Sequence, residues 1–267
     1  MTDFMNRDGW DGPYMVVECR KALSPSRLPG IDYALNPYSG CSHGCVYCYA
    51  PEVTHSDWKG WRIPRVRQNI ATRLSKEIGP LNGVIGIGTS TDPYQYAEKR
   101  FELTRQCLEV ISHKGMSVNI MTKSDLFLRD SDLLSGMRHA IGVTITHIDD
   151  AVSKRTEPGA PLPSVRLSAM KDAVDNGLAV YGLIGPIMST VKGSEESIVE
   201  AVISTGVTAV CLDRLNMRPL LGERLQRMGI STSDDSVNRM RSLFVAAGLD
   251  VADAFGEGWH EQLLNRA

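Results

Sequence analysis

The stretch that most constrains this chain is residues 36–50, NPYSGCSHGCVYCYA, in which three cysteines are spaced C-x3-C-x2-C. A single tight loop with this spacing can wrap a small inorganic cluster. Thiolates are soft ligands that suit iron–sulfur clusters, and a [4Fe–4S] cluster held entirely by protein takes four cysteines. Cys41, Cys45 and Cys48 would leave one iron open to a small molecule. The spacing therefore predicts a reactive cluster rather than a structural one.

Two other kinds of site compete for this loop. A structural zinc site takes four protein ligands, and His43 is the obvious fourth. His43 lies inside the first cysteine interval, so the loop would have to fold back on itself to present all four groups. A disulfide with one spare thiol requires an oxidising compartment, and nothing in the sequence indicates secretion. The three-cysteine cluster is the favoured interpretation.

Length and composition limit the remaining possibilities. A chain of 267 residues that is 42% hydrophobic can bury a full core as one domain. Its net charge of −2 provides no global basic field to attract nucleic acid. The sequence shows no signal peptide and no apolar stretch of membrane-spanning length, so we expect no membrane association. Six cysteines without secretory signals predict a reducing, cytoplasmic location.

Short apolar runs alternate with helical patterns along most of the chain. The runs cover residues 31–35, 84–87, 117–121, 141–145, 178–184 and 207–212. The helical patterns cover residues 68–78, 99–113, 131–139, 163–176, 194–204, 223–228 and 235–246. Apolar strands separated by helices predict an α/β fold, in which parallel strands with outer helices curl into a partial (β/α)6 TIM-like barrel.

We expect this barrel to form a single domain over residues 1–267. Residues 1–30 are predicted to be an irregular lead-in, because glycines and prolines interrupt them. Residues 31–213 form the predicted barrel core, and residues 214–267 a C-terminal helical extension.

Polar residues follow the predicted strands, where barrel enzymes gather their chemistry. The cysteine loop follows the first strand, and residues 89–92 (Thr-Ser-Thr-Asp) follow the second. Hydroxyls and a carboxylate of this kind accept hydrogen bonds from a buried ammonium, although they also suit a capped turn. Lys123 follows the third strand, and Thr144 lies within the fourth.

Two single residues are weak catalytic candidates. His147 lies at the end of the fourth strand and has the chemistry of a proton shuttle, yet such a histidine is more often simply hydrogen-bonded. Cys211 lies late in the sixth strand, where its thiol would donate a hydrogen atom if it faced the barrel lumen. The alternative for Cys211 is a small core residue. Cys19 and Cys107 are predicted to be inert or core thiols.

The cysteine spacing, with Tyr47 just before the last cysteine, resembles the radical S-adenosylmethionine superfamily. Residues 36–38 and 47–50 are similar to the branch that includes spore photoproduct lyase, and the resemblance runs from about residue 32 to about residue 212. It implies a [4Fe–4S] cluster on Cys41, Cys45 and Cys48 whose open iron binds S-adenosylmethionine. In that superfamily an electron from the cluster releases a 5′-deoxyadenosyl radical, which abstracts hydrogen from a substrate.

The resemblance also implies contacts to S-adenosylmethionine near the cluster. Tyr47 is expected to pack against the adenine. The turn after the second strand occupies the place where the superfamily contacts the methionine amine, which makes Ser90, Thr91 and Asp92 the candidates.

Further cofactor contacts are implied along the third and fourth strands. Lys123 stands where the branch has a lysine that reaches the cofactor, and it would pair with the cofactor carboxylate. Thr144 replaces a serine that contacts the cofactor in the branch. Arg166 lies on the following helix, where it reaches back over the cofactor or forms a surface ion pair with Glu157.

The substrate class rests on family analogy and on one basic, aromatic segment. Mixed basic and aromatic residues grip phosphates and stack bases, although a solvated amphipathic connection explains them equally well. The segment comprises Trp58, Lys59, Trp61, Arg62, Arg65 and Arg67. It favours a nucleic acid or nucleotide-like substrate, with a small metabolite or a protein side chain as the alternative. An electron donor such as ferredoxin or flavodoxin is the expected partner. A different class of function is an iron–sulfur electron carrier or redox sensor that cleaves no S-adenosylmethionine.

One departure from the family pattern argues against spore photoproduct repair. Spore photoproduct lyase carries its catalytic cysteine just after the second strand, in a Cys-Thr-Ser-Asp run. The matching run here begins with Thr89. A hydroxyl O–H bond is much stronger than a thiol S–H bond, so Thr89 cannot return a hydrogen atom as that cysteine does.

Overall fold

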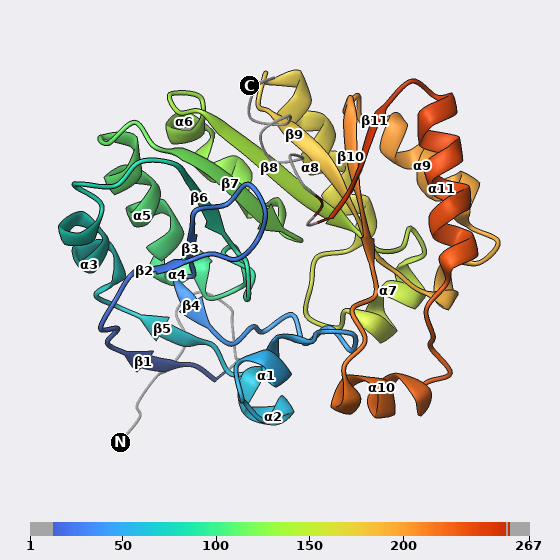
Figure 1. Ribbon diagram of the computed structural model, residues 1–267, viewed down its shortest axis with the longest axis horizontal. Coiled ribbons are helices and arrows are strands. Elements are labelled where there is room, and N and C mark those ends of the chain that lie inside the picture. The colour runs from blue at the N-terminus through green and yellow to red at the C-terminus, as the bar shows by residue number, and fades with distance from the viewer. Residues whose placement is uncertain (1–12, 255, 257–267) are drawn as a thin grey trace.

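The computed structural model describes residues 13–254 and residue 256. Its strands are β1 (Met15–Val17), β2 (Leu23–Pro25), β3 (Tyr33–Leu35), β4 (Tyr38–Ser39), β5 (Arg65–Arg67), β6 (Val84–Ile87), β7 (Ser117–Thr122), β8 (His139–Ile145), β9 (Val180–Ile187), β10 (Ala209–Arg214) and β11 (Asp250–Asp253). One eight-stranded sheet has the order β11-β10-β9-β8-β7-β6-β3-β2 (Figure 1). Its neighbours pair in parallel except β2, which is antiparallel to β3. The predicted α/β fold is confirmed as an open, barrel-like sheet with β2 and β11 as its edges.

Each of the six predicted strands is present in this sheet. The strands follow one another in chain order from β3 to β11, which is the order of a β/α barrel. Every residue of β8 is buried, so the sheet is covered on both faces at its centre. Burial on both faces explains why these strands read as continuous apolar runs rather than as alternating patterns.

The helices are α1 (Ala50–Val53), α2 (Trp58–Trp61), α3 (Ile70–Glu77), α4 (Glu98–Phe101), α5 (Leu103–Ser112), α6 (Ser131–Leu134), α7 (Asp150–Thr156), α8 (Pro163–Asp175), α9 (Glu195–Ile203), α10 (Pro219–Gln226) and α11 (Asp234–Ala246). Short 3-10 helices cover Asp125–Asp130 and Ser189–Val191. Helices α3, α5, α6, α8, α9 and α11 lie along the outer face of the sheet (Figure 1). Within the described ranges, no helix has the length and apolarity needed to cross a membrane.

The helix predicted over residues 99–113 is divided into α4 and α5. Glu102 adopts a left-handed conformation with φ of 50°, which ends α4 and begins α5. The buried Glu98 carboxylate accepts hydrogen bonds from the backbone N–H groups of Thr104 and Arg105, at 2.9 and 3.2 Å. N–H groups in the first turn of a helix have no partner within the helix, so Glu98 caps α5. The cap starts a second helix where one continuous helix was predicted.

The two ends of the described chain differ from the prediction. The lead-in predicted to be irregular contains β1 and β2, and β1 pairs in parallel with β5 in a separate sheet of order β1-β5-β4. The C-terminal extension predicted to be helical also contains β11, which pairs in parallel with β10. Both corrections concern strands of three or four residues, which are too short for their alternation to be read in a sequence.

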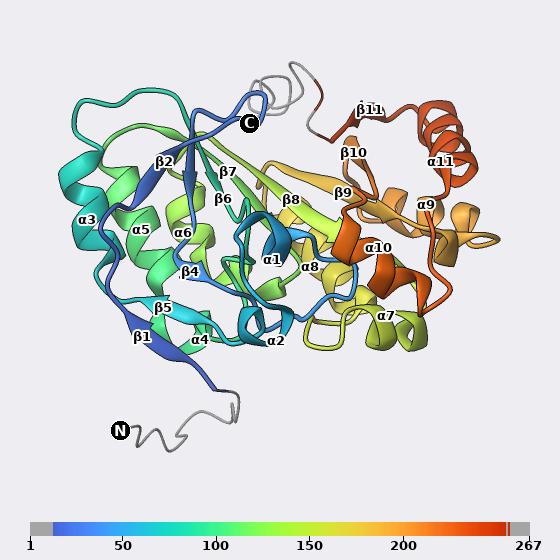
Figure 2. The same cartoon turned by 60° about the horizontal axis from the view of Figure 1, so that its bottom comes forward.

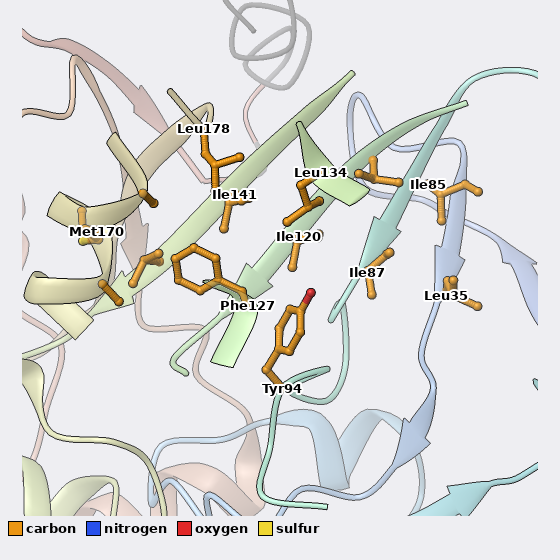
Figure 3. Close-up of a cluster of buried hydrophobic side chains, with 14 of the residues drawn as sticks. Leu35, Ile85, Ile87, Tyr94, Ile120, Phe127, Leu134, Ile141, Met170 and Leu178 are labelled. Atoms are coloured by element: carbon orange, nitrogen blue, oxygen red, sulfur yellow. The ribbon is translucent and has the colours of Figure 1, made fainter. Parts of the chain in front are cut away.

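One hydrophobic core lies between the sheet and the outer helices (Figure 3). Leu35, Ile87, Ile120 and Ile141 project from neighbouring strands toward the side of the sheet that carries Phe127 (Figure 3). A second cluster surrounds the cysteine loop, where α10 packs against it; its buried members are Cys45, Tyr47, Met188, Leu215, Leu221, Leu225 and Ile230. The loop is therefore supported by its own small core, separate from the main one.

Candidate cofactor site

A cavity of about 180 Å³ lies at the carboxyl ends of the parallel strands. Its wall is formed by the cysteine loop, by the turns after β6 and β7, and by the ends of β8, β9 and β10. Helices α1, α2 and α10 lie together at this end of the sheet (Figures 1 and 2). The predicted site residues that line the cavity are Cys41, Cys45, Tyr47, Cys48, Ser90, Thr91, Asp92, Lys123 and Thr144. They converge because parallel strands deliver their carboxyl ends to one side of a sheet.

The first half of the cysteine loop is fixed by the turn after β6 and by α2. The backbone N–H of Cys41 donates to the carbonyl of Trp61 at 2.8 Å. The carbonyl of Gly40 accepts from the Thr91 hydroxyl at 2.6 Å and from the Gln95 side chain at 3.0 Å. Gly40 has φ of 83°, and a Cβ there would lie 2.6 Å from the Trp61 carbonyl oxygen. Glycine is required here because the loop touches α2 backbone to backbone.

The second half of the loop is held by segments that come much later in the chain. The N–H of Val46 donates to the carbonyl of Thr156 at 2.8 Å. The Arg224 side chain of α10 donates to the carbonyls of Val46 and Cys48 at 2.6 and 2.8 Å. The same guanidinium lies 3.7 Å from the centre of the Trp58 ring. The loop is thus anchored by α7, α10 and α2 independently of any bound group.

The three loop thiols are free, and they are held in a protonated state by their surroundings. Burial raises the pKa of each thiol, that of Cys41 to about 12. Metal binding requires the thiolate, so a metal group bound here would displace protons from the cysteines. Buried thiols of this kind are inert unless a soft metal group converts them to thiolates.

The residues around the cysteines fit an iron–sulfur cluster. The Trp61 side chain is 3% exposed, and its Nε1–H has no hydrogen-bond partner among the described residues. Burial raises the pKa of the Cys48 thiol, and the nearby Trp61 side chain partly opposes this rise. Cluster sulfurs accept hydrogen bonds from buried N–H groups, which stabilise the bound cluster. Three thiols with an unused donor beside them match that requirement.

The zinc alternative draws no support from the geometry of the loop. The imidazole of His43 is buried, and its Nδ1 lies 3.5 Å from the Asp92 carboxylate. His43 lines the same cavity as the cysteines, but its Nδ1 is directed at the turn after β6.

In the turn after β6, the side chains of Thr91 and Asp92 are hydrogen-bonded to the protein, whereas that of Ser90 is not. The Asp92 carboxylate accepts from the Thr122 hydroxyl at 2.8 Å and from the N–H of Lys123 at 2.7 Å. The Thr91 hydroxyl donates to the cysteine loop, as described above. The Ser90 hydroxyl lines the cavity and makes no hydrogen bond to the described residues. Among the three predicted amine contacts, Ser90 is the one whose side chain is available.

Lys123 places a positive charge inside the cavity. Its Nζ lies 5.6 Å from the centre of the Tyr47 ring and makes no hydrogen bond to the described residues. Burial lowers the pKa of Lys123, but Cys45 and Glu157 more than offset this, so the pKa is raised overall. The ammonium group is therefore charged at neutral pH and lacks a close counter-ion.

Arg166 lies behind the cavity wall and is paired with Glu157. The two side chains are fully buried, and Arg166 Nη2 lies 2.5 Å from Glu157 Oε2. Arg166 also donates to the carbonyls of Pro161 and Thr144, at 2.7 and 3.2 Å. Burial raises the pKa of Glu157, but Arg166 and Lys123 outweigh this and hold it at about 2. The structure thus gives Arg166 an ion pair with Glu157 that is buried, and not at the surface as expected, while a contact to the cofactor stays a prediction.

Glu157 also connects this ion pair to the cysteine loop. Its carboxylate accepts hydrogen bonds from the hydroxyls of Tyr47 and Thr146. Tyr47 lines the cavity with its ring while its hydroxyl is held from behind. The Tyr47 hydroxyl is therefore held in place by Glu157, while packing of the ring against the adenine stays a prediction.

The two weak catalytic candidates do not line the cavity. His147 is 3% exposed, its Nε2 has no partner among the described residues, and burial lowers its pKa to about 4. Cys211 belongs to a buried cluster on the inner side of the sheet, together with Tyr181 and Ala209. Burial raises the pKa of the Cys211 thiol. A catalytic role for either residue stays a prediction.

Part of the cavity wall was not predicted from the sequence. Its polar side chains are Tyr49, Asp213 and Asn216, and the apolar Leu215 lines the same cavity. The end of β9 contributes Leu183 and Pro186 to this wall. The signal was available for Asp213, since it ends the sixth strand as Lys123 follows the third. Tyr49 lay within the cysteine loop but was considered only as part of a motif.

A protein-family model matches more than half of this chain. The Radical SAM superfamily model matches residues 35–205. An uncharacterized protein of Methanocaldococcus jannaschii is 33% identical over 177 residues, which are 64% of this chain and 66% of that protein. An uncharacterized protein of Mycobacterium tuberculosis is 28% identical over 221 residues, which are 76% of this chain and 65% of that protein. The chain thus spans just under two thirds of the length of these curated relatives.

Solved structures show the same fold at low sequence identity. Spore photoproduct lyase complexed with dinucleoside spore photoproduct has a TM-score of 0.67 at 15% identity, over 88% of this chain and 80% of that one. A radical SAM methyltransferase from Sphaerobacter thermophilus has a TM-score of 0.54 at 15% identity, over 86% of this chain and 67% of that one. These two enzymes share the architecture of the present chain, in which the cavity lies at the carboxyl ends of the strands.

Proposed function

Because the chain belongs to the radical S-adenosylmethionine superfamily, we propose that it is an enzyme that reductively cleaves S-adenosylmethionine at a [4Fe–4S] cluster and abstracts hydrogen from a substrate. The observation that carries this proposal is the convergence in one cavity of three free thiols and a lysine that forms no ion pair with the described residues. When bound, the cluster and S-adenosylmethionine supply an electron and a carbon radical, chemistry that no side chain provides. Cys41, Cys45 and Cys48 would hold the cluster.

The remaining cavity side chains bind and orient S-adenosylmethionine. The Lys123 ammonium pairs with the methionine carboxylate, because it is charged and forms no ion pair with the described residues of the cavity wall. The hydroxyls of Ser90 and Thr144 line the cavity without hydrogen-bond partners among the described residues, so they are free to contact the amine or the ribose. The Tyr47 ring forms the platform for the adenine.

The proposal includes a reducing environment and a protein that delivers electrons. Buried thiols and an oxygen-sensitive cluster suit the cytoplasm, where cysteines stay reduced. The cluster needs a one-electron donor, and a ferredoxin or flavodoxin has the required chemistry.

Reduction of the reconstituted protein with dithionite is expected to convert S-adenosylmethionine into methionine and 5′-deoxyadenosine. Lys123→Ala should retain the cluster but bind S-adenosylmethionine about ten- to hundredfold more weakly, since a buried charge-assisted contact is worth about 1.5–3 kcal/mol. The exposed Lys192→Ala is the matched control and should bind normally. Mass spectrometry of the products and equilibrium dialysis of the cofactor measure both effects. A reduced, intact cluster that leaves S-adenosylmethionine uncleaved would instead indicate an electron carrier or redox sensor.

The nucleic acid substrate expected from the basic, aromatic segment receives limited support. Trp61 is buried, and Arg67 donates to the carbonyl of Asn36 at 2.7 Å, so both side chains serve the fold. Lys59, Arg62 and Arg65 are exposed. A nucleic acid substrate remains a proposal that rests on family likeness and these three residues, and a small metabolite is the competing proposal.

Spore photoproduct repair is not expected of this protein. Thr89 lines the cavity, and its hydroxyl oxygen accepts a hydrogen bond from the Asn36 side chain at 3.0 Å. Incubation of reduced enzyme with the dinucleoside photoproduct should therefore give no multiple-turnover reversion to two thymines. Thr89→Cys is the informative companion variant, because it restores a thiol at this place. Chromatography measures the thymines released. Efficient reversion by the unaltered protein would contradict the prediction that it does not repair the photoproduct.

A further inference from the structure

The end of the cavity that faces β10 holds three polar side chains that the proposed cofactor contacts leave unused. Tyr49, Asp213 and Asn216 line this end, and none of their side chains makes a hydrogen bond or ion pair with the described residues. They lie beside the apolar Leu183, Pro186 and Leu215, which also line the wall here. An apolar wall with a few unpaired polar groups is typical of a small-molecule subsite.

The fold of β10 directs Asp213 into the cavity. Side chains of a strand alternate between its faces, so Asp213 shares the inner face with Ala209 and Cys211. The pairing register between β9 and β10 shifts between Leu212 and Arg214, and such irregularities re-aim the side chain within them. A Cβ at Gly185 would lie 2.5 Å from the Asp213 Cβ, so glycine at that position makes room for the aspartate.

An unpaired carboxylate in this position is costly for the folded protein. Burial raises the pKa of Asp213 to about 7, and the charge of Lys123 only partly opposes this rise. The two side chains form no ion pair with each other across the cavity. If Lys123 is occupied by the S-adenosylmethionine carboxylate, Asp213 has no other cationic side chain within the described cavity wall. A ligand with a positive charge and N–H donors would supply the carboxylate with both a counter-ion and hydrogen bonds.

We propose that Asp213 binds the substrate directly and selects a small molecule that carries a basic amino, amidino or guanidino group. This inference rests on the proposed function, since it assigns the substrate of the same site. Asp213 contacts the basic group, and the apolar wall beside it contacts the carbon skeleton. The hydroxyl of Tyr49 and the amide of Asn216 accept or donate the remaining hydrogen bonds.

The first experiment separates substrate contact from cofactor contact. Asp213→Asn keeps the size of the side chain and removes its charge, and the exposed Asp235→Asn on α11 is the matched control. Equilibrium dialysis should show S-adenosylmethionine binding by reconstituted Asp213→Asn within about twofold of the unaltered protein. A tenfold loss of cofactor affinity would assign Asp213 to S-adenosylmethionine and overturn the proposal.

The second experiment tests the charge of the substrate. Small molecules from a cell extract are divided on a cation exchanger at pH 8, and each fraction is added to reduced enzyme with S-adenosylmethionine. The retained fraction should increase 5′-deoxyadenosine formation several-fold, and Asp213→Asn should lose most of that increase while Asp235→Asn keeps it. If the unaltered protein cleaves S-adenosylmethionine and yet is stimulated only by the unretained fraction, or is not stimulated by the retained one, this inference is overturned. Either result leaves the proposed function intact. Absence of cleavage under all conditions overturns the proposed function as well.

The third measurement needs no catalysis. Because Asp213 is partly buried and unpaired, Asp213→Asn should raise the melting temperature of the reconstituted protein at pH 8, since it removes an uncompensated charge. A residue with a structural partner would give the opposite shift. A lowered melting temperature for Asp213→Asn, with Asp235→Asn unchanged, would therefore overturn the proposal.

Discussion

Replacing Cys41, Cys45 or Cys48 by alanine is expected to abolish iron loading, while the unaltered protein takes up about four irons per chain on anaerobic reconstitution. The effect is large because a cluster held by three protein thiolates cannot be retained by two. No other described cysteine compensates, since Cys19, Cys107 and Cys211 are buried in other parts of the molecule and do not line the cavity. Iron and sulfide assays together with the visible absorption of the cluster measure the outcome.

Cys211→Ala is the control for this experiment, because it removes a buried thiol that does not line the cavity. It should load a full cluster. Full loading of any of the three loop variants would contradict the cluster assignment. A stable protein with one zinc, lost in His43→Ala, would contradict it in favour of the zinc alternative.

The sequence predicted the parts of this molecule that depend on local pattern and chain order. Six strands and most of the outer helices were visible because each buries a continuous run or one helical face. The cavity lining followed from one rule, that parallel strands bring their carboxyl ends together. Lys123 and Thr144 are far apart in the sequence, yet both line the cavity for this reason.

The features that the sequence did not predict depend on contacts between distant residues. The break between α4 and α5 arises because Glu98 folds back to cap α5, which no pattern around Glu102 indicates. The position of Arg166 depends on Glu157, because a buried guanidinium takes whichever carboxylate the fold brings near. Asp213 stands at a strand end as Lys123 does, but its significance appears only when its lack of a partner in the cavity is seen.

The Glu157–Arg166 ion pair connects the stability of the fold to the geometry of the site. Glu157 receives hydrogen bonds from Arg166 on α8, from Tyr47 in the cysteine loop and from Thr146 after β8. A buried ion pair contributes little relative to apolar residues of the same shape, but removing one partner leaves an uncompensated charge. The consequence of a single substitution is therefore expected to exceed the net contribution of the pair.

Glu157→Ala is expected to lower the free energy of unfolding by about 3–5 kcal/mol, because it leaves the Arg166 guanidinium buried without its counter-ion. Urea denaturation at pH 7 measures this, since the pKa of Glu157 of about 2 keeps the carboxylate charged there. The exposed pair of Glu196 and Arg239 supplies the control, and Glu196→Ala should cost less than about 1 kcal/mol.

Replacing both buried partners, as in Glu157→Leu with Arg166→Met, should restore much of the lost stability, because no charge then remains buried. The double variant would still lack the carboxylate that holds the Tyr47 hydroxyl. We therefore expect it to fold and to load its cluster, yet to bind S-adenosylmethionine more weakly than the unaltered protein. A cost below about 1 kcal/mol for Glu157→Ala would show that the pair is solvated in solution, and the link from this pair through Tyr47 to the cofactor site would then fail.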